Sequence, residues 1–216
     1  MELLAETWAY VVDNAGRFQE ALLVHIGLSF GALAIAMLIF IPLGVLASMG
    51  GRLTASIVGA VAAVRVIPSL AVILLLLPIY GLGWRPALIA LTLLAGPPLV
   101  INTDTGLRGV DAATLEAATG LGMTNSQRFW RVKMPLALPV IVTGVRSAAV
   151  EVIGSATLAA FVGAGGLGLF ITSGITLVDE RLLLSGAIAV TILALLTEWT
   201  LARLEHRLTH PGTAQA

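Results

Sequence analysis

Long apolar runs separated by short polar segments make up most of this chain. A helix needs about 20 consecutive apolar residues to cross the hydrocarbon core of a membrane. Five runs reach that length, at residues 22–48, 54–80, 86–107, 135–161 and 182–203. The pattern therefore predicts an all-α integral membrane protein with about five transmembrane helices, in which the spans themselves direct insertion.

The basic residues between the runs predict an orientation, because cytoplasmic loops are enriched in lysine and arginine. If the segment with Arg52 is cytoplasmic, the segment 108–134 and the C-terminus face the same side. That side carries seven basic residues, and the other carries three: Arg52, Arg108, Arg128, Arg131, Lys133, Arg203 and Arg207 against Arg17, Arg85 and Arg181. We expect an external or interfacial segment 1–21, a transmembrane domain 22–205 and a cytoplasmic tail 206–216, with the N-terminus outside.

The composition narrows the class of protein. Hydrophobic residues form 58% of the 216-residue chain and charged residues only 11%, and the mean hydropathy is +1.00, unlike soluble domains. The formal net charge is zero, so no global field attracts nucleic acid. Cysteine is absent, and the three histidines are too scattered in the sequence for a metal cluster, so we expect no metal site.

Prolines interrupt the predicted spans. Proline removes a backbone donor and bends a helix, and the freed carbonyls are tolerated in a membrane only against protein or in a wet cavity. Taken singly, each proline is consistent with an ordinary kink. Polar side chains accompany the prolines in RVIPSL and AGPPLVINTD, so we expect broken helices near Pro68 and Pro97–Pro98 that face a translocation path. The candidate path residues there are Pro68, Ser69, Asn102 and Thr103.

The segment 108–135 predicts a helix, a glycine turn and a second helix. Asp111 is a good N-cap, and Gly120 with Gly122 ends the first helix. Thr124 and Gln127 have the spacing of a capping box, and Pro135 opens the next span. Phe129 and Trp130 lie among basic residues, and two adjacent aromatic side chains in a solvated loop indicate a partner surface.

The stretch FVGAGGLGLF has the spacing G-x-G-x-x-G of a dinucleotide-binding turn. That turn needs a preceding strand, a following helix and an acidic residue about 20 positions later. A long apolar run precedes the glycines instead, so nucleotide binding is not expected.

The segment after residue 115 resembles a known signature. Glu116, Ala117 and Ala118, then Gly122, Val132 and Met134–Pro135, resemble the sequence E-A-A-x3-G-x9-I-x-L-P of ABC-importer permeases, with valine and methionine at two positions. The stretches IPSLAVILLLLPIYGLGWRPALIAL and SATLAAFVGAGGLG are similar to the permeases of osmoprotectant importers, over about residues 22–205. The resemblance implies a type I importer permease architecture, like that of methionine permeases, with cytoplasmic coupling helices.

The resemblance also implies partners. Such a permease works with two ATPase subunits, a second permease copy or homologous permease, an external binding protein and membrane lipid. The chain has no G-x-x-x-x-G-K-[ST] loop, so ATP and Mg would bind the partner ATPase and no cofactor would bind here. Residues 111–133 would be coupling helices, with Glu116 as an acidic contact or helix brace and Gly122 as a close-packed turn. The expected coupling residues are Glu116, Ala117, Ala118, Gly122, Met123, Phe129, Trp130, Arg131 and Pro135.

In similar permeases a GAGGLG stretch follows this span on the outer side. Gly163, Gly165, Gly166 and Gly168 would then form an outer hairpin beside the gate and the binding-protein dock, the alternative being a plain tight turn.

Glu151 departs from the family pattern. A bare charge at mid-depth in a membrane is costly and needs a partner. Arg146 is five positions away and poorly aligned on one helix face, since helix neighbours lie three or four apart. An interhelical pair such as Glu151 with Arg65 is one interpretation, and a carboxylate facing a cation path is the other.

The function expected is import of quaternary ammonium osmoprotectants such as glycine betaine, carnitine or choline, by a transport subunit that is not an enzyme. Import of a methionine-like amino acid or another amine is the alternative. A secondary transporter would have no use for a helical EAA loop. No Ser-His, paired-Asp or H-E-x-x-H arrangement occurs in the spans to indicate an intramembrane enzyme. The expected location is the cytoplasmic membrane of a bacterium or archaeon.

Overall fold

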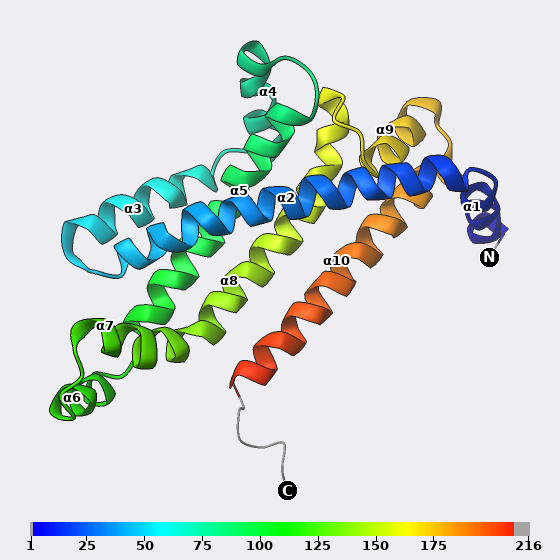
Figure 1. Cartoon of the computed structure of the whole chain (residues 1–216). Coiled ribbons are helices and arrows are strands. Elements are labelled where there is room, and N and C mark those ends of the chain that lie inside the picture. The colour runs from blue at the N-terminus through cyan, green and yellow to red at the C-terminus, as the bar shows by residue number, and fades with distance from the viewer. Residues whose placement is uncertain (1, 210–216) are drawn as a thin grey trace, which may run out of the picture.

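The computed structural model describes residues 2–209, and all regular elements within that range are helical (Figure 1). In chain order they are α1 (Glu2–Asp13), α2 (Ala15–Ala47), α3 (Gly51–Val64), α4 (Ser69–Tyr80), α5 (Trp84–Arg108), α6 (Ala112–Gly120), α7 (Asn125–Arg128), the π-helical turn η1 (Phe129–Lys133), α8 (Met134–Ser155), the 3₁₀ helix η2 (Ala156–Val162), α9 (Gly168–Leu177) and α10 (Glu180–Thr209). The expected all-helical membrane architecture is confirmed.

Four helical segments are long and apolar enough to cross a membrane, and a bent pair brings the number to five. The four are α2, α5, the continuous segment from α7 to η2, and α10. They correspond to the predicted spans at 22–48, 86–107, 135–161 and 182–203. The bounds of α5 agree with the prediction to within two residues, whereas α2 begins seven residues before residue 22 and the segment from α7 begins ten residues before residue 135.

The span predicted at 54–80 is not one straight helix. α3 and α4 meet at an angle of 91° across residues 65–68. Pro68 explains the break, because proline disfavours helical geometry in the residue before it and cannot donate a backbone hydrogen bond. The interruption expected at Pro68 is therefore present, as a sharp corner.

The interruption expected at Pro97–Pro98 is wrong. Both prolines are buried inside α5, which continues from Trp84 to Arg108. Neighbouring helices hold this region closely: a Cβ on Gly96 would meet the Phe40 ring of α2 at 2.8 Å. Packing in a bundle stabilises a helix across residues that would break it in isolation. Pro42, Pro78 and Pro139 likewise lie inside α2, α4 and α8.

The core is formed by α5 between α2 and α8. Small residues let these backbones approach closely, as is common between membrane helices. A Cβ on Gly44 of α2 would lie 2.5 Å from the Thr103 side chain, and one on Gly144 of α8 would lie 2.8 Å from the Pro98 carbonyl oxygen. α10 packs on the other side of α8, and α1 packs against α10.

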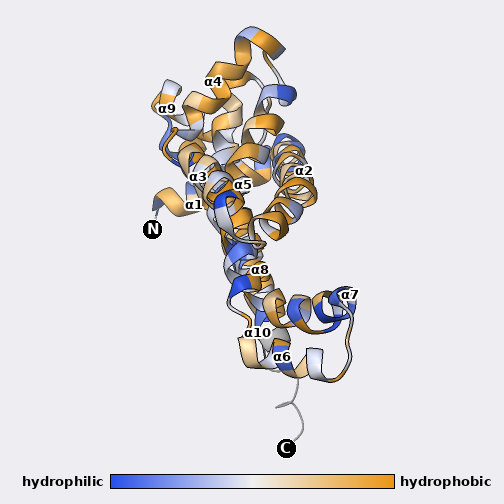
Figure 2. Ribbon diagram, turned by 90° about the vertical axis from the view of Figure 1, so that its left-hand side faces the viewer, coloured by the Kyte–Doolittle hydropathy of each residue, from blue (hydrophilic) through white to orange (hydrophobic). Residues whose placement is uncertain are grey.

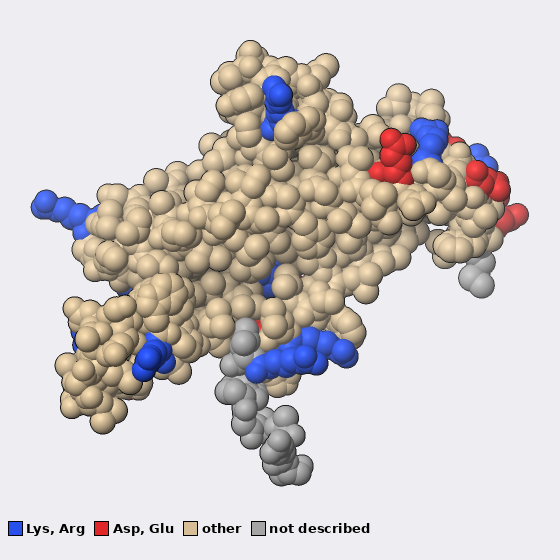
Figure 3. All heavy atoms as spheres, in the orientation of Figure 1, with Lys and Arg blue, Asp and Glu red and all other residues tan. Residues whose placement is uncertain are grey.

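Charged residues gather toward the two ends of the bundle. Helices α6 and α7 project at one end, and α1 and α9 lie at the other (Figure 1). Figure 2 shows hydrophilic residues concentrated at the α6–α7 end and hydrophobic ribbon over most of the bundle. On the face drawn in Figure 3, the charged side chains lie around the margin, near α6 and α7, on α4, near the end of α10 and around α1, and the surface between them carries little charge. This distribution is typical of a protein that spans a membrane.

Candidate functional site

The turn between α6 and α7 is fixed by local hydrogen bonds. The Asp111 carboxylate accepts from the Thr114 backbone N–H at 3.1 Å and so caps α6. At the other end, Gly122 adopts φ +77°, and the Met123 N–H donates to the Ala118 carbonyl at 3.2 Å. This is the pattern in which a left-handed glycine ends a helix. Gly122 is therefore required for its backbone conformation, since a Cβ there would meet nothing within 4 Å.

α7 is capped as the sequence predicts and is also tied to α6. Thr124 and Gln127 form a complete capping box. The Arg128 guanidinium donates to the Thr119 hydroxyl of α6 at 2.5 Å and also to the Asn125 side chain. Arg128 was missed as a functional candidate, because its partner on α6 is nine positions away and not part of any short motif.

Phe129 and Trp130 lie in the π-helical turn that joins α7 to α8. Their rings pack edge to face, with centroids 5.0 Å apart. Trp130 remains 63% exposed, and Leu121 in the preceding turn is 80% exposed. Single turns of π-helix are frequent at functional sites. Large apolar side chains exposed on a polar, hydrogen-bonded scaffold are typical of a surface that binds another protein.

The remaining residues of the EAA stretch divide into exposed and packed positions. Glu116 and Ala117 are exposed, Ala118 is buried and Met123 is half-buried. Glu116 forms no hydrogen bond or ion pair with any residue between 2 and 209, which favours an outward contact over a brace within this helix. Arg131 and Pro135 are also exposed at the start of the next span.

The residues expected along a path occupy two different environments. Pro68 is exposed at the α3–α4 corner, and Ser69 beside it is half-buried. Asn102 donates its side-chain N–H to the Pro98 carbonyl at 2.8 Å, next to Gly144 of α8. Thr103 is fully buried against Gly44. For Asn102 and Thr103 to line an open path, α5 would have to separate from α8 and α2.

Glu151 and Arg65 do not form an ion pair in the described part of the chain. Glu151 is half-buried on α8, and Arg65, exposed at the α3–α4 corner, attracts it electrostatically from beyond contact distance. Each of the two charges is therefore at least partly accessible without a direct contact to the other.

Arg146 has partners that sequence reasoning missed. Its guanidinium lies 3.2 Å from Glu198 and 2.8 Å from Glu205, both on α10. The Thr143 hydroxyl donates to the other Glu205 oxygen at 2.7 Å. These contacts join α8 to α10 and explain how a charged residue is accommodated in the span.

The glycine-rich loop is a tight turn between η2 and α9. Gly163, Gly165 and Gly166 have φ of +75°, +83° and +83°, a region that side chains with a Cβ rarely adopt. Gly168 begins α9, and a Cβ there would lie 2.0 Å from the Thr157 carbonyl oxygen. The loop therefore needs glycine for conformation at its start and for space at its end.

The glycine loop also contacts a buried histidine. A Cβ on Gly166 would lie 3.2 Å from the His25 Nδ1 atom, and the His25 Nε2 atom lies 3.1 Å from the Ile153 carbonyl oxygen. His25 is completely buried. It therefore links α2, the end of α8 and the loop. Residues 2–209 contain no group of three or more histidine and acidic side chains that could hold a metal ion.

Comparison with known proteins identifies the relatives of this chain. The family model described as "Binding-protein-dependent transport system inner membrane component" matches residues 40–210. The carnitine transport permease protein OpuCB of Listeria monocytogenes is 41% identical over 89% of this chain and 88% of its own length. The osmoprotectant import permease protein OsmW of Salmonella typhimurium is 39% identical over 96% and 99%. The choline transport system permease protein OpuBB of Bacillus subtilis is 37% identical over 94% of both chains.

Solved structures share the fold at lower identity. An inward-facing crystal form of the methionine ABC transporter MetNI contains a chain that is 21% identical, with a TM-score of 0.80 over 91% of this chain and 98% of that one. An amino acid ABC transporter crystallised with histidines gives a TM-score of 0.72 at 18% identity, over 92% and 95%. The expected likeness to a methionine permease is thus confirmed for the architecture.

Proposed function

Because the chain belongs to the family of binding-protein-dependent transport system inner membrane components, we propose that it is the permease of an importer for quaternary ammonium osmoprotectants. Members of this family are multi-pass inner membrane proteins that act with ATPase subunits in ABC transporters. The chain is a transport subunit rather than the catalyst, and the family implies no cofactor in it. Glycine betaine, carnitine and choline are the proposed solutes, since relatives at 37–41% identity are named for carnitine, choline and osmoprotectant transport.

One observation supports the coupling role most directly. The α6–α7 unit, residues 111–133, has a side-chain cap on each of its two helices, and it leaves Trp130 and Leu121 exposed. Residues 111–133 would insert into a groove of one of the two ATPase subunits, and ATP and Mg would bind to those subunits. Closure of the ATPases would then rock the spans as rigid bodies and give alternating access.

The complete transporter would contain a second permease copy or a homologous permease and an external binding protein. Domain 22–205 would enclose half of the path, with membrane lipid around it. The α6–α7 end would be cytoplasmic, with the N-terminus outside and residues 206–216 inside, in a bacterial or archaeal membrane. The basic residues Arg128, Arg131 and Lys133 of the α6–α7 end support this orientation.

The path would lie on the open face that carries Pro68, Ser69 and Glu151, with Asn102 and Thr103 exposed when α5 moves against its neighbours. The glycine turn from Gly163 to Gly168 would act beside the external gate. Its contact with buried His25, which in turn contacts the Ile153 carbonyl of α8, supports a role in transmitting movement of that span.

Reconstitution tests this proposal. Proteoliposomes that contain the chain, its ATPase, its binding protein and any second permease should accumulate labelled glycine betaine, carnitine or choline only with ATP at the ATPase side. Accumulation of a methionine-like amino acid instead would show that the proposed solute class is wrong and that the importer carries that amino acid. Uptake by this chain alone, driven by a proton or sodium gradient, would indicate a secondary transporter.

A further inference from the structure

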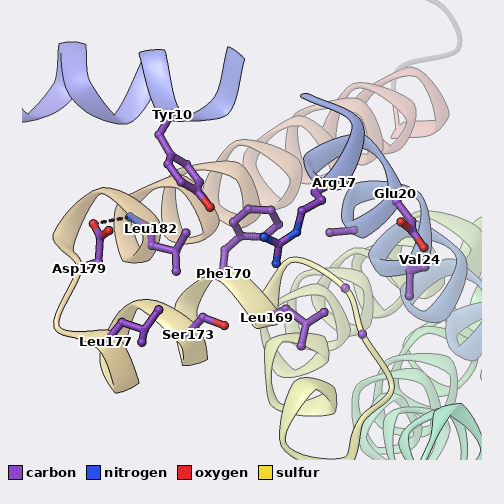
Figure 4. Close-up of a pocket in the computed structure, with 13 residues that line it drawn as sticks. Tyr10, Arg17, Glu20, Val24, Leu169, Phe170, Ser173, Leu177, Asp179 and Leu182 are labelled. Atoms are coloured by element: carbon purple, nitrogen blue, oxygen red, sulfur yellow. Dashed lines mark hydrogen bonds between the residues drawn. The ribbon is translucent and has the colours of Figure 1, made fainter. Parts of the chain in front are cut away.

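A cavity of about 430 Å³ lies at the end of the bundle opposite α6 and α7, where α1, the start of α2, α9 and the start of α10 meet. Figure 4 shows Tyr10, Arg17 and Ser173 entering it from three different helices. Volumes of this size are ordinary for small-molecule sites. The side chains that give the cavity its chemistry are Tyr10, Arg17, Glu20, Phe170, Ser173 and Asp179.

The cavity contains one unpaired base and one unpaired acid. Neither the Arg17 guanidinium nor the Glu20 carboxylate has a hydrogen-bond or ion-pair partner among residues 2–209. They are three positions apart on α2, a spacing at which opposite charges usually interact. In Figure 4 the Arg17 side chain extends toward Phe170, whereas Glu20 lies on the Val24 side. Separated opposite charges in one cavity match a ligand that carries both charges itself.

Asp179 is already neutralised. Its carboxylate accepts from the Arg181 side chain at 3.3 Å and from the Arg181 and Leu182 backbone N–H groups at 3.0 and 3.3 Å. The hydrogen bond from the Arg181 side chain holds the pKa of Asp179 below its ordinary value. Arg181 therefore balances Asp179, and Arg17 and Glu20 remain as the unpaired charges of the cavity lining.

Two aromatic side chains complete the wall. Phe170 is buried, and its ring is held edge to face against Phe18 of α2 with centroids 5.6 Å apart. Tyr10 is half-buried on α1, with its hydroxyl directed toward Phe170 and Arg17 (Figure 4). Aromatic faces attract quaternary ammonium groups, and a guanidinium binds a carboxylate through two parallel hydrogen bonds.

We infer that this cavity is a binding site on the permease itself for zwitterionic solutes that carry a quaternary ammonium group and a carboxylate. Arg17 holds the carboxylate, and Tyr10 and Phe170, with Glu20 nearby, hold the ammonium group. The inference deepens the proposed function and rests on it for the solute class. It also predicts selectivity, because choline has the ammonium group but no carboxylate for Arg17.

Binding to the purified chain in nanodiscs, without ATPase or binding protein, tests the site. The probes are labelled glycine betaine, carnitine and choline, and the discs contain only lipids with anionic glycerol headgroups. We expect saturable binding of both zwitterions and weaker binding of choline. Arg17→Gln should weaken glycine betaine binding about tenfold, since a hydrogen bond to a charged group contributes about 1.5–3 kcal/mol, and should change choline binding less than about twofold.

Three further variants test whether the effect is specific to this cavity. Arg52→Gln makes the same change at an exposed position on α3, away from the cavity, and should leave the binding of all three probes unchanged. Tyr10→Leu should weaken glycine betaine and choline alike, and Tyr10→Phe should restore both. Absence of saturable binding, or equal glycine betaine affinity in wild type and Arg17→Gln, overturns the inference.

A zwitterionic lipid headgroup offers the same two charges. Phosphatidylcholine added to the discs should leave the glycine betaine affinity unchanged. Displacement of glycine betaine by that lipid would make the cavity a headgroup site and overturn the solute inference.

ATP-driven uptake by the complete transporter distinguishes the binding-site inference from the proposed function. Uptake without binding at this cavity would reject the site and retain the proposed function. Absence of uptake for any quaternary ammonium solute would reject the proposed function, whatever the binding result.

Discussion

The two ends of the bundle are built in different ways. At the α6–α7 end, the caps at Asp111 and Thr124 and the turn at Gly122 use partners within three to five positions. At the opposite end, the glycine loop packs against His25, more than a hundred positions earlier in the chain. The first end is held by local hydrogen bonds and exposes Leu121 and Trp130. The second depends on the assembled bundle, so a change there should disturb the whole fold.

The largest effect is expected at Gly168, where the neighbouring backbone leaves no room for a side chain. A Cβ on Gly168 would lie 2.0 Å from the Thr157 carbonyl oxygen, and backbone cannot move aside cheaply. We expect Gly168→Ala to lower the free energy of unfolding by about 3 kcal/mol, at the upper end of overpacking costs. Thermal unfolding of the purified protein in detergent measures it. Gly59→Ala, where a Cβ would meet nothing within 4 Å, is the matched control; similar melting of both variants would contradict the packing of α9 on η2.

The next test concerns the exposed surface at the α6–α7 end. Trp130→Ala should weaken binding of the ATPase subunit about 30-fold, because truncation of a central aromatic residue at an interface costs about 2 kcal/mol. Melting of the permease should be unchanged, since Trp130 is mostly outside the bundle. Trp8→Ala, at an exposed tryptophan of the opposite end, should leave ATPase affinity within about twofold. Equal loss in both variants would remove the assignment of α6–α7 as the coupling surface.

Arg146 tests the contact between α8 and α10. Arg146→Gln removes the guanidinium that contacts both Glu198 and Glu205, and removal of one partner of a buried pair costs about 3–5 kcal/mol. The three side chains are 22–42% exposed, so solvent reduces the expected loss of stability to about 2 kcal/mol. Arg207→Gln, at an exposed position on the same helix as the two acids, should melt like wild type. No difference between the variants would show that the ion pairs add nothing to α8–α10 packing.

The smallest effect is expected at Gly122. Its φ of +77° costs a residue with a Cβ about 1–2 kcal/mol, but no atom lies close enough to clash. Gly122→Ala should therefore lower the melting temperature slightly, while Gly122→Asn, which tolerates this conformation, should lower it less. Hydrogen exchange at the Met123 amide should increase in Gly122→Ala. A loss as large as that of Gly168→Ala would mean that the two glycines have the same role.

Elements specified by near neighbours could be predicted from the sequence. The spans follow from apolar length, the α6–α7 unit from its caps, and the corner at residues 65–68 from Pro68. The 91° angle of that corner depends on packing and has no signal in the sequence. The same proline rule gave a wrong break at Pro97–Pro98, because it takes no account of α2 and α8 holding α5 on both sides.

The candidate sites also divide into those set by neighbours in the sequence and those set by the packing of distant helices. Asp111, Thr124 and the exposed aromatic pair were identifiable because each motif is short. The partners of Arg146 are 52 and 59 positions away on α10, so no spacing rule could find them. The Arg17 cavity is assembled from α1, α2, α9 and α10, and its charges are ordinary surface residues until those helices meet.

The length of α2 has a consequence for how the protein sits in a bilayer. With 33 residues, α2 is about 50 Å long, whereas the hydrocarbon core is about 30 Å thick. Its stretch without charged side chains, residues 21–47, is about 40 Å long and matches that thickness only if the helix tilts by about 40°, the upper limit usually observed. At that tilt Arg17 and Glu20 lie at headgroup depth. A thinner bilayer would force α2 to tilt further or leave more of it exposed, so bilayer thickness should affect the geometry of the cavity before that of the α6–α7 unit.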